Sequence, residues 1–138
     1  MNFDLTIVDE YERRHGAKET FQRAGDFMLT FLTNMTTRFP PVAARGLSTA
    51  AASRKGVAPA SQTEEALKDC WKYIDDRKAS SDFRTPEHCI VRATIYALQG
   101  EPAPGERVSD ELDMFIRLAN KFEDRSSSVN PLLEKYFS

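Results

Sequence analysis

Glu12 and His15 are the first residues along the chain whose types and spacing could support chemistry. A carboxylate and an imidazole three residues apart on a helix can ligate one of the paired metals of a di-iron bundle. Such a site needs a second copy of the pair, and the other histidine, His88, has Thr85 rather than an acid three positions before it. We therefore predict no metal site, and we interpret Glu12 and His15 as the solvated end of a helix.

A second candidate is the run Glu87, His88 and Cys89, which combines a carboxylate, a base and a thiol. Consecutive side chains on a helix point about 100° apart, so His88 cannot orient Cys89 as a base must orient its nucleophile. We expect His88 to be exposed in the first turn of a helix. Cys89 and Cys70 fall on apolar faces without CxxC spacing, so both are expected to be buried as small hydrophobic residues.

No other catalytic pattern is present. The six glycines are scattered and form no phosphate-binding loop. The sequence thus predicts no catalytic residue, no cofactor and no enzymatic activity.

The segment 27–63 could bind nucleic acid or an acidic partner through its charge. It contains Arg38, Arg45, Arg54 and Lys55 and no acidic residue at all. Basic residues that neutralise phosphates supply most of the affinity of nucleic-acid-binding proteins. A nucleic-acid-binding regulator that uses residues 38–58 is therefore the alternative function predicted from the sequence.

A helix-turn-helix is the most specific hypothesis for this basic segment. Gly46 would allow the chain to turn, and Ser53 and Arg54 would face the groove of DNA. A recognition helix also needs bulky apolar residues that dock on the preceding helix, whereas the docking positions here are alanines. We therefore predict that residues 39–60 form one long flexible basic loop, with at most a weak helix at 47–54.

The C-terminus concentrates large apolar residues behind a serine spacer at 126–128. Residues 126–138 are predicted to contain a short helical turn that opens at Asn130 and Pro131. Its apolar side chains either pack onto the chain's own bundle, which is the favoured interpretation, or enter the groove of a partner as an amphipathic helix does. The residues concerned are Leu132, Leu133, Tyr136 and Phe137.

Composition bounds the class of protein. The chain has 138 residues, of which 41% are hydrophobic and 29% charged, as in an ordinary globular domain. A net charge of −2 argues against coating nucleic acid by bulk charge. The N-terminus lacks a signal-like pattern, no run is apolar enough to span a membrane, and only two cysteines occur. We therefore expect an intracellular, most simply cytoplasmic, soluble protein.

Helical periodicity predicts the elements that would position these residues. Apolar stripes indicate helices at about 17–38, 61–78, 85–99 and 109–122, and a helix is chosen over a strand for the N-terminal residues. Ser61, Thr85 and Ser109 are the expected start signals. Trp71 lies on the apolar stripe of its helix and is predicted to pack in the core. The segment 86–99 is apolar on nearly every face and is followed by Gly100, so it is predicted to be the central helix.

These patterns together predict an all-α fold, an irregular bundle of about five helices in one domain spanning residues 1–138. The predicted function is a non-enzymatic protein–protein interaction module, which would be a subunit, adaptor or regulator of a larger assembly. Its partner would be a protein, with nucleic acid less favoured and a homo-oligomer also considered. The contacts would use the four basic residues of the 39–60 region and its flank, and the four apolar residues of the C-terminal turn.

Overall fold

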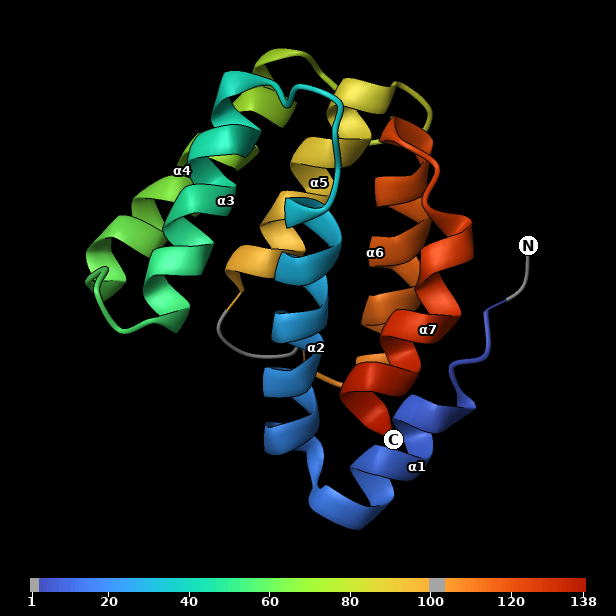
Figure 1. The fold of residues 1–138 in the computed structure, drawn as a ribbon. Coiled ribbons are helices and arrows are strands. Elements are labelled where there is room, and N and C mark those ends of the chain that lie inside the picture. The colour runs from blue at the N-terminus through green and yellow to red at the C-terminus, as the bar shows by residue number, and fades with distance from the viewer. Residues whose placement is uncertain (1–2, 100–103) are drawn as a thin grey trace.

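The computed structural model describes residues 3–99 and 104–138, and every regular element within them is an α-helix (Figure 1). The predicted all-α class is therefore confirmed, but these residues form seven helices rather than about five. The helices are α1 (Thr6–His15), α2 (Ala17–Thr33), α3 (Pro41–Arg54), α4 (Ala60–Asp76), α5 (Pro86–Leu98), α6 (Val108–Phe122) and α7 (Ser126–Phe137).

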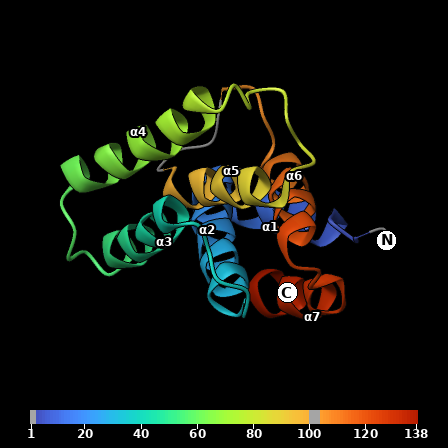
Figure 2. The ribbon, with the colours of Figure 1, turned by 90° about the horizontal axis from the view of Figure 1, so that it is seen from above.

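Helix α5 lies at the centre of the bundle, as its sequence predicts. It packs against α2, α3, α4 and α6, and Figure 2 shows it between the α3–α4 pair on one side and α6 on the other. Most of its side chains are buried, including Cys89, Ile90 and Val91 in its first half. A helix that is apolar on all sides is stable only when neighbours cover every face, which is what these four helices do. Gly100, the predicted end signal, lies outside the described residues.

The predicted flexible basic loop at 39–60 is wrong, because most of this segment is helix α3. Alanine has the highest helix propensity of all residues, and α3 contains five alanines. Pro41 occupies the first turn of α3, where a backbone N–H would have no partner within the helix, so proline is tolerated there and marks the start of the helix. The small residues Ala43, Gly46 and Ala50 are buried, which lets α3 approach its neighbours closely.

Three of the predicted helix starts are displaced, and none of the described helices has a side-chain capping hydrogen bond at its N-cap. Helix α4 begins at Ala60, one residue before Ser61, and α6 begins at Val108, before Ser109. The predicted spacer at 126–128 is the first turn of α7, so Pro131 lies inside that helix. Side-chain oxygens can cap only where the local backbone lets them reach, which spacing alone does not specify.

Helix α7 closes the bundle against α1 and α2. Phe137 is fully buried and packs edge-on against Tyr11, with ring centroids 5.6 Å apart. Its ring also lies 6.4 Å from that of Phe27 in α2. These contacts hold the C-terminal helix to the N-terminal half of the chain, beside α1 (Figure 1).

Helix α2 ends at Thr33 instead of the predicted Arg38. The residues that follow it are hydrogen-bonded to the junction between α6 and α7. One carboxylate oxygen of Glu123 accepts hydrogen bonds from the backbone N–H of Thr36 at 2.9 Å and of Thr37 at 2.7 Å. Arg125 donates to Glu123 and to the Asn34 carbonyl. Hydrogen bonds to the carboxylate, from Thr37 above all, lower the pKa of Glu123 to about 2.

In the described part of the chain, none of the helices combines the length and the hydrophobicity that crossing a bilayer requires.

Candidate partner-binding face

Exposed apolar side chains gather on one face of the bundle. Among the described residues, the exposed large apolar side chains are Val57, Trp71, Phe83 and Met114. Val57 lies in the turn between α3 and α4, whereas the other three line two neighbouring pockets. Arg92 joins these pockets, because it lines one of them and its guanidinium lies over the ring of Phe83 in the other. Gathered exposed apolar side chains usually mark an interaction site.

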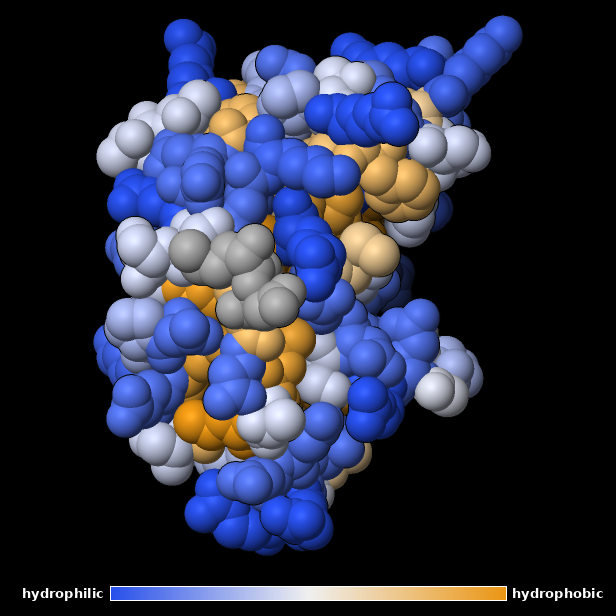
Figure 3. All heavy atoms as spheres, turned by 90° about the vertical axis from the view of Figure 1, so that its right-hand side faces the viewer, coloured by the Kyte–Doolittle hydropathy of each residue, from blue (hydrophilic) through white to orange (hydrophobic). Residues whose placement is uncertain are grey.

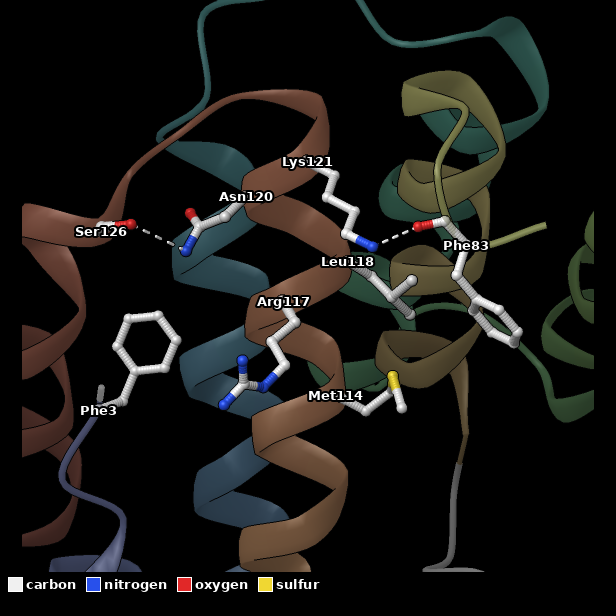
Figure 4. A pocket seen from close by; sticks show the side chains of 8 residues that line it. All are labelled: Phe3, Phe83, Met114, Arg117, Leu118, Asn120, Lys121 and Ser126. Carbon is white, nitrogen blue, oxygen red and sulfur yellow. Dashed lines mark hydrogen bonds between the residues drawn. The ribbon is translucent and has the colours of Figure 1, made fainter. Parts of the chain in front are cut away.

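The larger of the two, here called the apolar pocket, has a volume of about 480 Å³ (Figure 4). Helix α6 crosses it, with Phe3 on one side and Phe83 on the other. Figure 3 shows that hydrophobic residues reach the surface on this side of the molecule between hydrophilic ones. The volume falls in the range of about 300–1,000 Å³ that is usual for ligand pockets. Its lining residues are Phe3, Phe83, Met114, Arg117, Leu118, Asn120, Lys121 and Ser126.

The rim of the apolar pocket carries two cations, one of which is paired with a carboxylate. Arg117 extends across it, held at its Nε by the Asp113 carboxylate at 3.0 Å. The Lys121 ammonium group donates to the carbonyl of Phe83, as Figure 4 shows. Both cations are exposed, so an approaching carboxylate would meet them at the edge of an apolar surface.

Phe83 is fixed in its exposed position although it belongs to the α4–α5 loop (residues 77–85). The Lys121 bond holds its carbonyl, and the Arg92 guanidinium lies 4.6 Å from the centre of its ring, a cation–π contact. Arg92 also donates to the carbonyls of Ala79 and Ser80 in the same loop. A ring held in this way loses little conformational entropy when a partner covers it.

The Asp82 carboxylate stabilises the same loop by accepting hydrogen bonds from residues within it. Its carboxylate accepts hydrogen bonds from the backbone N–H of Arg84 at 2.8 Å and of Thr85 at 3.1 Å, and from the Thr85 hydroxyl. These bonds, led by that of the Thr85 hydroxyl, hold the pKa of Asp82 well below its usual value. The same carboxylate lies 2.9 Å from Nδ1 of His88.

The environment of His88 corrects the expectation that this side chain is exposed. Its side chain is only 17% exposed, because it lies against Asp82 and edge-on to the ring of Tyr73. Cys89, its neighbour in sequence, is fully buried among apolar residues. His88 therefore contributes to the structure of the α4–α5 loop, because it contacts Asp82, whose carboxylate accepts hydrogen bonds from the residues after Phe83.

The smaller pocket, here called the acidic pocket, has a volume of about 210 Å³ and lies beside α5, between α4 and α6. Trp71 forms part of its wall and is 42% exposed, so the prediction that Trp71 packs in the core is wrong. The other lining residues are Arg92, Ile95, Tyr96, Gln99, Glu106 and Glu111.

The four basic residues predicted to bind a partner lie along α3 and its ends, and all are exposed. Arg54 is paired with the Asp26 carboxylate at 2.7 Å and donates to the carbonyl of Gln22. Arg45 lines a shallow pocket together with the acidic residues Glu65 and Asp69 of α4. Two of the four cations thus have carboxylates beside them, which weakens the positive potential of this surface.

The four C-terminal residues predicted to bind a partner pack onto the chain's own bundle. Leu133 and Phe137 are buried, while Leu132 and Tyr136 are half-buried and rest against the core. The hydroxyl of Tyr136 lies 2.6 Å from that of Thr30 in α2. These contacts account for the apolar character of the segment without a partner.

The residues first considered for chemistry do not come together. His15 pairs with Glu19 at 3.5 Å, and no cluster of three metal-ligating side chains occurs within residues 3–99 and 104–138. Both cysteines are buried and free. Burial raises the pKa of the Cys70 thiol to about 11 and also raises that of Cys89, so neither is a thiolate near neutral pH.

One residue of this face, Met114, could have been found from the helical periodicity of the sequence. Helix α6 has its apolar stripe at Leu112, Phe115 and Ile116, and Met114 falls beside that stripe. An apolar side chain off the core-facing stripe of a helix faces solvent unless another element covers it. Phe83 has no such signal, because a loop residue belongs to no stripe.

Comparison with known proteins yields no match: no family model, no curated protein and no solved structure corresponds significantly to this chain. A function for this face must therefore be argued from its own residues.

Proposed function

We propose that this protein is a non-enzymatic interaction module, an intracellular subunit, adaptor or regulator, and that it binds a protein partner through the apolar pocket. The observation that carries the proposal is the exposure of Phe83 on a loop whose hydrogen bonds hold it in place. Few residues dominate most protein interfaces, and these are large side chains that are rigid before binding.

The charges at the rim define the chemistry of the partner. Arg117 and Lys121 lie at the edge of the pocket, and Arg84 follows Phe83 in the loop. We therefore propose that the bound segment presents a large apolar side chain to Phe83 and Met114, and a carboxylate next to it. Opposite charges at a rim mainly raise the association rate and select the correct partner.

A partner segment explains this surface better than a small ligand does. A ligand pocket encloses most of the surface of its ligand, whereas Phe83 and Met114, each about 40% exposed, project at the open edge of this pocket. The exposed Trp71 ring also lies nearby, 6.0 Å from the Arg92 guanidinium. The exposed aromatic residues therefore extend beyond the limits of one small pocket. A folded partner or an amphipathic helix could cover all of them.

The decisive experiment is a selection for the occupant. A library of displayed peptides is selected on the wild-type chain and counter-selected on a double variant, Phe83→Ser with Met114→Ser. We expect the enriched peptides to share a large apolar residue next to Asp or Glu. A matched control, Arg45→Ala with Lys55→Ala, changes two exposed residues on α3 and should bind these peptides like the wild type.

Four results would contradict the proposal. Peptides that bind the double variant as well as the wild type would place the site elsewhere. If the α3 control no longer binds the peptides, the binding site would lie on α3. If the wild type retards nucleic acid in a gel and the α3 control does not, the basic residues of α3 would instead bind nucleic acid. A small molecule that copurifies with the wild type and is absent from the double variant in native mass spectrometry would make the pocket a ligand site.

A further inference from the structure

Helix α6 keeps one face exposed to solvent. It packs against α1, α2 and α5, and its exposed residues are Asp110, Met114, Arg117 and Lys121. These residues are separated by four, three and four positions, so their side chains lie on one stripe of the helix. In a coiled coil, residues with this spacing form the seam along which two helices pack. Helix α6 therefore presents an exposed stripe, here called the α6 seam, that a second helix could cover.

The charges of the α6 seam are ordered along the helix. Asp110 lies in the first turn and Lys121 in the last turn, an order that also suits the helix dipole. The midpoint of the seam falls between Met114 and Arg117. When an identical helix lies antiparallel about this midpoint, Lys121 of each copy faces Asp110 of the other, and Met114 faces Arg117. The seam is therefore complementary to an antiparallel copy of itself, whereas a parallel copy would place like charges opposite each other.

The contacts that these side chains already make are compatible with a second copy. The Lys121 ammonium group has three N–H bonds and donates to the Phe83 carbonyl, which leaves others for a carboxylate. Arg107 pairs with Asp110 at 3.4 Å and also lies 3.7 Å from the Asp9 carboxylate, so it keeps a partner when Asp110 turns toward the second copy. Exposed ion pairs of this kind contribute little to stability, so their rearrangement is easily offset.

The centre of the α6 seam coincides with the apolar pocket. Met114 and Arg117 both line this pocket, and Met114 is 40% exposed (Figure 4). Arg117 is paired with Asp113 of its own helix at 3.0 Å, so two Arg117 side chains near a twofold axis repel each other less than unpaired cations would. The alkyl part of Arg117 can therefore pack against Met114 of the second copy.

We propose that the partner bound at the apolar pocket is a second copy of this chain, held by antiparallel packing of α6 against α6 about a twofold axis. This inference rests on the proposed function, because it names the occupant of the same site. The second copy supplies the chemistry proposed for the partner. Its Met114 is the large apolar side chain, and its Asp110 is the carboxylate that meets Lys121. A seam of four residues per copy makes a small interface, so the dimer is weak and depends on concentration.

Sedimentation velocity of the wild type, from micromolar to millimolar concentration, measures this association. We expect a reversible monomer–dimer equilibrium that weakens as salt is raised, because the facing charges are exposed to screening. Asp110→Lys places two basic side chains opposite each other, and Lys121→Glu places two acidic ones. Each variant alone should raise the dissociation constant by about tenfold or more, since a twofold dimer contains every altered contact twice.

An equimolar mixture of these two variants is the decisive sample. The introduced lysine of one variant then faces the introduced glutamate of the other, and Lys121 of the first faces Asp110 of the second. The mixture should therefore form a heterodimer about as stable as the wild-type dimer, which also shows that both variants fold. Glu134→Lys is the matched control, because it reverses an exposed charge on α7 and should dimerise like the wild type.

Two results would overturn the inference. One is a wild type that stays monomeric at every concentration, and the other is a mixture that associates no more strongly than each variant alone. A monomeric wild type that still selects peptides through Phe83 and Met114 would exclude the second copy and leave the proposed function standing. A dimer restored by mixing, in a protein that selects no peptide, would support the second copy and contradict binding of an unrelated partner segment.

Discussion

Gly46 of α3 faces Thr94 of α5 so closely that a Cβ atom on the glycine would lie 2.7 Å from Cγ2 of Thr94. The same Cβ would lie 3.3 Å from Leu98 Cδ1. Thr94 is itself fixed, because it is buried and its hydroxyl donates to the Ile90 carbonyl at 2.8 Å. A methyl group at position 46 therefore has no space unless the two helices move apart.

Gly46→Ala should consequently destabilise the protein by about 1–3 kcal/mol, the usual cost of overpacking a core. Urea denaturation followed by circular dichroism measures the change. Gly25→Ala is the matched control, because its Cβ would meet only the guanidinium end of the exposed Arg54 side chain, which can move. We expect the control to change stability by less than about 1 kcal/mol. Equal effects of the two variants would mean that α3 and α5 are not in close contact.

Phe137→Ala should cost about 3–5 kcal/mol, as do other removals of a buried phenylalanine. Phe137 is fully buried against Tyr11 and Phe27, so its loss leaves a cavity where α7 meets α1 and α2. Thermal or chemical unfolding reports the loss. Lys135→Ala on the exposed side of the same helix should stay within about 0.5 kcal/mol of the wild type. A stable Phe137→Ala protein that loses a partner would instead return the C-terminal helix to the role of a partner anchor.

Stability should fall with acidification between about pH 4.5 and pH 2, in part because of Glu123. Its pKa is lowered from 4.5 to about 2 in the folded protein, so within this interval the unfolded chain binds the proton more readily. The stabilisation is therefore present above pH 4.5 and is lost as the pH falls through the folded value. Glu123→Gln should flatten the dependence of the free energy of unfolding on pH in this interval. A parallel curve, displaced by a constant amount, would show that Glu123 contributes no such linkage.

Asp82→Asn should loosen the loop that presents Phe83, because an amide cannot accept all the hydrogen bonds that this carboxylate accepts from Arg84, Thr85 and His88. Amide hydrogen exchange should become faster in residues 79–85, and partner peptides should bind more weakly. Asp75→Asn removes the same charge from the exposed end of α4 and should leave both measurements unchanged. Unchanged exchange in Asp82→Asn would mean that the loop is held by other contacts.

The helical class and the central position of α5 are readable from the sequence. Cys89, Ile90 and Val91 are apolar in succession, and a helix with apolar residues on every side requires neighbours on every side. The sequence also favours packing of the C-terminal residues on the chain's own bundle, because their apolar side chains share one face of a helix. Leu133 and Phe137 lie one helical turn apart, so they share the face that α7 turns toward the core.

Tertiary structure alone decides that α3 is a packed helix. Ala43, Gly46 and Ala50 have too little side chain to form a detectable apolar stripe, so helical periodicity does not indicate which face of this segment is buried. Their small size becomes stabilising only when a second helix fills the space, as Thr94 and Leu98 do for Gly46.

The candidate face depends on the fold in the same way. The sequence determined that Trp71 lies on the apolar stripe of α4. Helices α3 and α5 cover only part of this stripe, so Trp71 remains partly exposed. Phe83 belongs to a loop, and its place beside Met114 follows from contacts with Lys121 and Arg92 that are distant in sequence. Periodicity reports which side chains share a face of a helix, whereas exposure depends on how much of that face the neighbouring helices cover.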